Sequence, residues 1–111
     1  MSVEHVPIAE LPSFLERFSR GHRGWLTKVE RTDPTDRGEV DGCERPLGGI
    51  VSDPDREGVL VFLEERPHGS LRYRIDNAAE LRRETADGVV RLEIDSADGS
   101  TTVVECHPAG H

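Results

Sequence analysis

Residues 87–106 read DGVVRLEIDSADGSTTVVEC, and this segment carries the clearest architectural information in the chain. From Val90 to Ile94, apolar residues alternate with charged ones, as in a strand with one buried face. Asp-Gly pairs at positions 87–88 and 98–99 are typical of tight hairpin turns. Connections this short join antiparallel strands, because a parallel crossover needs about a dozen residues or more. The segment therefore predicts an antiparallel meander.

Similar signals extend upstream from this meander. Leu71, Tyr73 and Ile75 alternate with charged residues, which predicts another strand with one buried face. Residues 59–65 form a continuous apolar run, which predicts a strand buried on both faces. The short connections predict that each strand pairs with its predecessor. Further strands are expected at residues 25–30, 47–52 and 79–85.

A single helix is expected before the sheet, at residues 11–20. Its apolar positions Leu11, Phe14, Leu15 and Phe18 have the spacing of one helical face. Pro12 suits its first turn, and Gly21 suits the position just past its end.

The expected fold is α+β and mostly β. A short N-terminal helix precedes six or seven antiparallel strands within residues 24–106, which form a curved sheet or a small barrel. Residues 1–10 are expected to be an arm and residues 107–111 a tail. At 111 residues the chain has the size of one domain. Because its core is modest, a homodimer interface remains an open alternative.

The charge balance limits the partners. Acidic residues number 22 and basic residues 14, for a net charge of -8. This charge disfavours nucleic acid and anionic membranes as partners. The N-terminus lacks the features of a signal peptide, so we expect a cytoplasmic protein. No cofactor-binding motif is present in the sequence, and we expect no cofactor.

Basic and aromatic residues gather where the expected helix meets the first strand. Arg20, His22 and Arg23 stand beside Trp25, the single tryptophan. Cations at this position stabilise the carboxyl end of a helix. Arginine and tryptophan together also form recognition sites for anions and protein partners. We therefore expect a non-catalytic binding or regulatory module that uses these four residues to bind a protein or a small anionic ligand.

An acidic turn provides the alternative. Asp53, Asp55 and Glu57 resemble the start of a calcium-binding loop, and Glu64 stands where such a loop has its last ligand. A following strand would carry Glu64 roughly 20 Å away at about 3.3 Å per residue. A weak divalent-cation site made by the first three carboxylates remains the alternative function.

Other chemistry has weaker signals. The tail contains Cys106, His107 and His111, which are ligand types for a soft metal, although a closed zinc site uses four ligands. An acidic cluster lies within residues 33–41 and matches no ligand spacing. The sequence has no nucleophile motif, so no catalytic residue is assigned and we expect no enzyme. A small enzyme of unassigned chemistry remains a second alternative.

Several short strings resemble a family of small bacterial proteins known as domain of unknown function 5335. They are Phe18-Ser19-Arg20, His22-Arg23-Gly24-Trp25-Leu26, Pro46-Leu47-Gly48-Gly49-Ile50 and Ile94 through Thr102. The resemblance covers the chain from the helix onward. It implies a stand-alone, soluble, single-domain protein without a cofactor, and it implies no activity or site residue.

Overall fold

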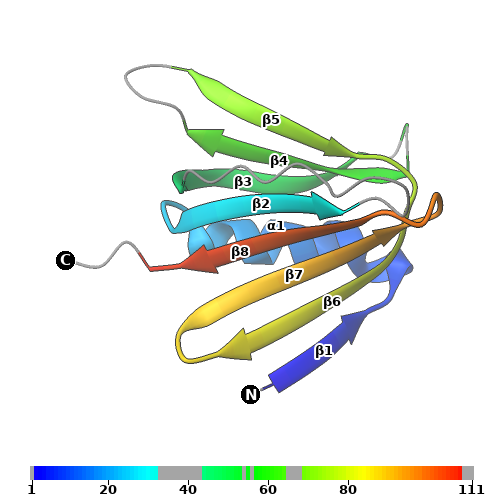
Figure 1. Ribbon diagram of the computed structural model, residues 1–111, viewed down its shortest axis with the longest axis horizontal. Coiled ribbons are helices and arrows are strands. Elements are labelled where there is room, and N and C mark those ends of the chain that lie inside the picture. The colour runs from blue at the N-terminus through cyan, green and yellow to red at the C-terminus, as the bar shows by residue number, and fades with distance from the viewer. Residues whose placement is uncertain (1, 33–43, 54, 56, 65–68, 109–111) are drawn as a thin grey trace.

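The chain forms an eight-stranded antiparallel sheet with one α-helix across one face (Figure 1). The computed structural model describes residues 2–32, 44–53, 55, 57–64 and 69–108. In chain order the elements are β1 (Ser2–Val6), η1 (Ile8–Glu10), α1 (Leu11–His22), β2 (Leu26–Thr32), β3 (Arg45–Asp53), β4 (Gly58–Glu64), β5 (Ser70–Ile75), β6 (Ala78–Ala86), β7 (Val89–Ser96) and β8 (Thr101–His107). The α+β, mostly β expectation is confirmed.

The strand order is β1-β6-β7-β8-β2-β3-β4-β5, so β1 and β5 are the two edges and the sheet does not close into a barrel. The expected pairing of β5 with β6 is wrong, because five other strands lie between them. Only Asp76 and Asn77 connect these two strands, and Asn77 has a φ of 53°. β5 and β6 therefore converge at the end where Asp76 and Asn77 join them and spread apart toward their other ends, as Figure 1 shows.

Two expectations about the N-terminus are also wrong. The described part of the expected arm, residues 2–10, is ordered structure, because β1 pairs with β6 and η1 leads into the helix. The sheet thus has eight strands. The helix does not end before Gly21 but continues through His22, and it is Gly24 that has a positive φ, 85°. The backbone reverses there, because glycine enters the left-handed region without steric cost.

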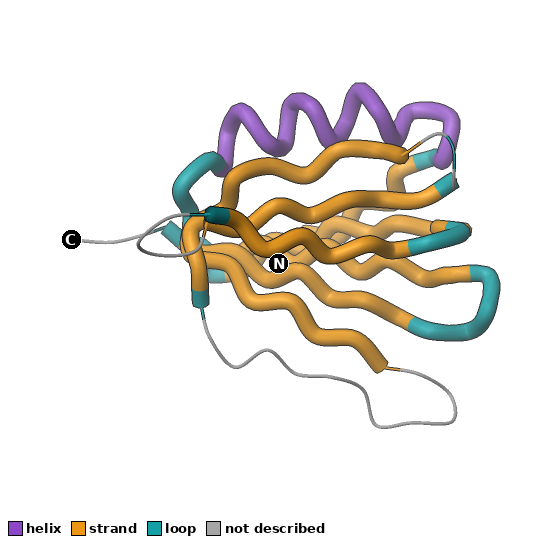
Figure 2. Tube along the Cα trace, turned by 90° about the horizontal axis from the view of Figure 1, so that it is seen from above, coloured by secondary structure: helices purple, strands orange, loops and turns teal. Residues whose placement is uncertain are grey.

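The core lies between α1 and the sheet (Figure 2). Helical spacing places four apolar residues of α1 on the buried side. From the sheet, alternate residues of each strand reach the same layer, as in β7, where Val90, Leu92 and Ile94 are buried. In β4 only one face is fully buried, because Leu60 and Phe62 on the other face are half-buried. The expectation that this strand is buried on both faces is therefore wrong.

Ser19 joins α1 to the edge of β3. Beyond Leu47, β3 has no pairing with β2 among the described residues, which leaves the backbone of Ile50 without a strand partner on that side. The Ser19 hydroxyl donates to the Ile50 carbonyl oxygen and accepts from the Ile50 N–H, both at 2.8 Å. One side chain thus takes the place of a neighbouring strand and sets the position of the helix.

Candidate functional site

A row of aromatic rings runs along α1 from its second turn and ends at Trp25, just after the helix. Phe14 and Phe18 stack with centroids 6.0 Å apart, and His22 stacks on Phe18 at 4.0 Å. Trp25 meets the His22 ring edge-on at 4.5 Å. The Nδ1–H of His22 donates to the Phe18 carbonyl oxygen at 2.8 Å. The helix end therefore presents a rigid aromatic row whose imidazole orientation is fixed.

A hollow of about 290 Å³ lies beside this row, between α1 and β6; we term it the α1–β6 hollow. Arg17 contributes to it from the helix, and Arg83 reaches it from β6 with its guanidinium carbon 6.0 Å from the centre of the Phe18 ring. This distance allows a cation–π contact. The lining residues are Glu4, Phe14, Arg17, Phe18, His22 and Arg83.

Positive charge dominates the α1–β6 hollow. Glu4 is the acidic residue among its lining, and its carboxylate lies 4.0 Å from Arg83 Nη1. The Nε atom of Arg83 is buried and has no hydrogen-bond partner. Burial lowers the pKa of His22, and the nearby Arg83 charge lowers it further, against the opposing effect of the Phe18 carbonyl. The neutral imidazole thus lies in a positive environment with few counter-charges.

The four residues of the predicted basic junction do not form one patch. His22 lines the α1–β6 hollow, whereas Trp25 contacts the His22 ring and is not among the lining residues. Arg20 and Arg23 line a different hollow, next to β3. Arg20 also pairs with Glu16 one turn earlier, at 2.5 Å. Arg20 and His22 are two positions apart on α1 and so lie on different sides of the helix, and Arg23 follows the last helical residue.

The acidic turn is also divided. Asp53 and Glu57 line a hollow of about 310 Å³ near the start of α1, whereas Asp55 is not among its lining residues. Asp53 accepts a hydrogen bond from the Asp55 backbone N–H at 3.2 Å. Within the described ranges, no group of three His, Cys, Asp or Glu side chains is placed to hold a metal ion. The structure thus adds no support for the cation hypothesis.

The C-terminal strand separates Cys106 from His107. Cys106 is fully buried beside the Thr27 hydroxyl, 3.3 Å away, and burial raises the pKa of its thiol to about 11. His107 points to the other face and contacts Glu44, whose carboxylate raises the imidazole pKa. The two side chains therefore cannot share a metal, and the thiol is not a nucleophile at neutral pH. His111 and residues 33–41 lie outside the described residues.

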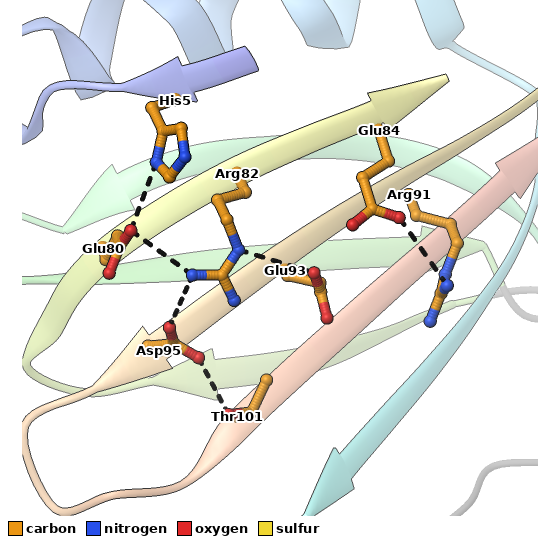
Figure 3. Close-up of polar contacts among 8 residues, drawn as sticks. All are labelled: His5, Glu80, Arg82, Glu84, Arg91, Glu93, Asp95 and Thr101. Atoms are coloured by element: carbon orange, nitrogen blue, oxygen red, sulfur yellow. Dashed lines mark hydrogen bonds and ion pairs between the residues drawn. The ribbon is translucent and has the colours of Figure 1, made fainter. Parts of the chain in front are cut away.

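A charge network occupies the sheet face opposite α1 (Figure 3). Arg82 lies at its centre, 3.0 Å from Asp95, 3.3 Å from Glu80 and 3.5 Å from Glu93. Burial lowers the pKa of Arg82, but the hydrogen bond to Asp95 and the charges of the three carboxylates outweigh it and keep this pKa above its usual value. Thr101 donates to Asp95 at 2.8 Å. Because each of these charged side chains has a partner of opposite sign, this network fits a cross-strand ladder better than a binding site.

Sequence reasoning missed Arg83, although a signal was present. Arg82 and Arg83 are adjacent on a strand, so their side chains must point to opposite faces. Leu81 is buried on the helix side, and Arg83 shares its face. When one face of a strand packs on the core, two consecutive arginines cannot both point to solvent. One of them therefore lies beside the apolar layer.

Comparisons with known proteins identify no relative. No family model, no curated protein and no solved structure matches the chain. The family resemblance stated from the sequence therefore stays a prediction. In the part of the chain that the structure describes, no helix is long and apolar enough to cross a membrane.

Proposed function

We propose that this protein is a non-catalytic binding module that holds a small anion, a carboxylate or a phosphate, in the α1–β6 hollow. The observation that carries the proposal is the buried Nε of Arg83, which has no hydrogen-bond partner. A buried donor without a partner costs about 1–3 kcal/mol, and more when it is charged. A small shift of the Arg83 side chain would bring this donor into contact with an anion oxygen in the hollow, and the hydrogen bond would remove that cost.

The charge balance supports the same ligand class. With His22 neutral, the two arginines exceed Glu4 by one positive charge at the hollow, within a chain of net charge -8. Arg17 is exposed, and no described residue forms an ion pair with it. Guanidinium groups bind carboxylates and phosphates in a bidentate manner, so Arg17 and Arg83 suit an anion placed between them.

His22 couples this binding to protonation. Because Nδ1–H donates to Phe18, the other ring nitrogen of the neutral imidazole is an acceptor and repels an anion. The nitrogen must take up a proton before it can donate to the ligand. Anion binding is therefore expected to raise the pKa of His22 above its value in the free protein.

Thermal melting in inorganic phosphate tests the proposal. At a phosphate concentration ten times the Kd, binding adds about 1.4 kcal/mol, which for a domain of this size raises the Tm by about 6 °C. Sodium chloride at equal ionic strength is the control for screening.

Two exposed arginines of α1 that line different hollows give matched variants. Arg17→Ala should abolish most of the phosphate-dependent shift, whereas Arg20→Ala, which removes the same charge beside the other hollow, should retain it. A shift of equal size in both variants, or no shift in the wild type at millimolar phosphate, would refute the proposed site.

A further inference from the structure

The second edge of the sheet, β5, has an unusual distribution of charge. Arg72 and Arg74 are exposed on the face opposite α1, and no described residue forms an ion pair with either. The charges of the β6–β7 network are instead satisfied by neighbours. In an acidic chain, two unpaired arginines on one edge strand are a local positive site.

Apolar side chains accompany these arginines. On the neighbouring strand β4, Phe62 pairs with Arg72 and Leu60 pairs with Arg74, and both apolar side chains are half-buried. On the helix side of β5, Leu71 and Tyr73 are partly buried against the core. An extended chain lying next to β5 would therefore find the two cations on one face and the apolar side chains of Leu71 and Tyr73 on the other.

We propose that β5 binds an acidic peptide in an extended conformation, which adds a strand to the sheet. An edge strand offers main-chain hydrogen-bonding groups along one side, and strand addition uses them for affinity. Side chains alternate along a strand, so acidic residues at every second position of the peptide would meet Arg72 and Arg74. The remaining positions would pack beside Leu71 and Tyr73.

Charge also argues against a second copy of this chain as the occupant. Two β5 strands paired antiparallel would bring the arginines of both copies together on one face, and like charges on paired strands are destabilising. The other edge, β1, carries Glu4 and His5 and belongs to the side of the sheet beside the α1–β6 hollow. The acidic peptide therefore fits β5 better than a symmetric dimer does.

Nuclear magnetic resonance titration of the ¹⁵N-labelled protein tests this proposal. The probe is a capped peptide of alternating glutamate and valine, about as long as β5, and the control peptide has lysine in place of glutamate. We expect amide shift changes confined to β5 and β4 with the acidic peptide and none with the lysine peptide.

Charge reversal supplies the matched variants. The double variant Arg72→Glu/Arg74→Glu should weaken acidic-peptide binding about tenfold or more, because two exposed ion pairs become repulsions. Arg20→Glu/Arg23→Glu changes the net charge equally in the hollow between α1 and β3, which β5 does not line, and should bind as the wild type does. If the first variant proves unfolded by circular dichroism, Arg72→Gln/Arg74→Gln replaces it.

Four results would overturn the proposal. They are the absence of β5 shifts at millimolar acidic peptide, equal binding of the lysine peptide, binding that survives removal of both arginine charges, and β5 shifts that depend on protein concentration without peptide. The last result would identify a second copy as the occupant. None of them bears on the α1–β6 hollow, where the arginines are different residues.

Discussion

Replacing Ser19 with alanine removes the hydroxyl that holds α1 to β3. Two hydrogen bonds of 2.8 Å are lost, and the N–H and carbonyl of Ile50, a residue with 0% exposure, lose their partner. Each such bond contributes about 0.5–1.5 kcal/mol net, and leaving the groups unpaired inside the protein adds to the loss. We expect the free energy of unfolding to fall by about 2–3 kcal/mol in total.

This loss is large enough to measure precisely. For a domain of this length, it corresponds to a Tm lower by roughly 10 °C. Ser13→Ala is the matched control, because Ser13 is exposed on the same helix. That variant should be neutral or slightly more stable, since alanine is the better helix former by about 0.5 kcal/mol.

Hydrogen exchange at the Ile50 amide locates the effect. In Ser19→Ala this amide should exchange faster relative to the amides of β7, because its acceptor is gone. Ser19→Thr retains the hydroxyl and should recover most of the protection. An ordinary surface substitution changes the free energy of unfolding by no more than about 0.5 kcal/mol. If Ser19→Ala stays within that range and the Ile50 amide remains protected from exchange, the assigned role of Ser19 is wrong.

Three further predictions concern the glycines, His22 and Cys106. Gly58→Ala should lower the free energy of unfolding by about 3 kcal/mol or more, because a Cβ there would lie 2.1 Å from the Ile75 carbonyl oxygen. A Cβ at Gly21 would meet nothing within 4 Å. Gly21→Ala should therefore stabilise α1 by about 0.5–1 kcal/mol, as measured by denaturant unfolding. The pKa of His22 is lowered in the fold, so below about pH 6.5 the unfolded chain takes up a proton that the folded chain does not. The free energy of unfolding should therefore fall as the pH drops through this window. The His22→Gln variant should lose less of this free energy over the same pH range. Equilibrium unfolding at several pH values measures both. In a Cys43→Ser variant the remaining thiol is that of Cys106, whose pKa is about 11. This thiol should not react with iodoacetamide at pH 8 until denaturant is added.

The sequence indicated β2 to β8 and the helix, but neither β1 nor the order of the strands in the sheet. Alternation in residues such as Leu92 and Ile94 depends on which side chains are buried, and that is a local property. Pairing between β6 and β1, or between β8 and β2, joins residues far apart in the chain. The short connection at Asp76 and Asn77 was misleading, because it joins converging strand ends and not neighbouring strands.

The candidate site was predictable only where its residues lie close together in the sequence. His22 and Trp25 were found because they follow the helix in sequence and stay close to it in space. Arg83 comes from a strand 61 positions beyond His22, and its place in the hollow depends on strand order. Arg20 and Arg23 were grouped with His22 because they are close in sequence, whereas in the fold both line the hollow beside β3.

The most direct test of the anion site is a pH titration of the His22 ring by nuclear magnetic resonance, with and without inorganic phosphate at constant ionic strength. The account predicts that phosphate raises the pKa of His22 and shifts the Arg17 and Arg83 amides together, and that Arg17→Ala suppresses both effects. An unchanged pKa of His22 at saturating phosphate, or shifts centred on Arg20 and Arg23, would contradict it.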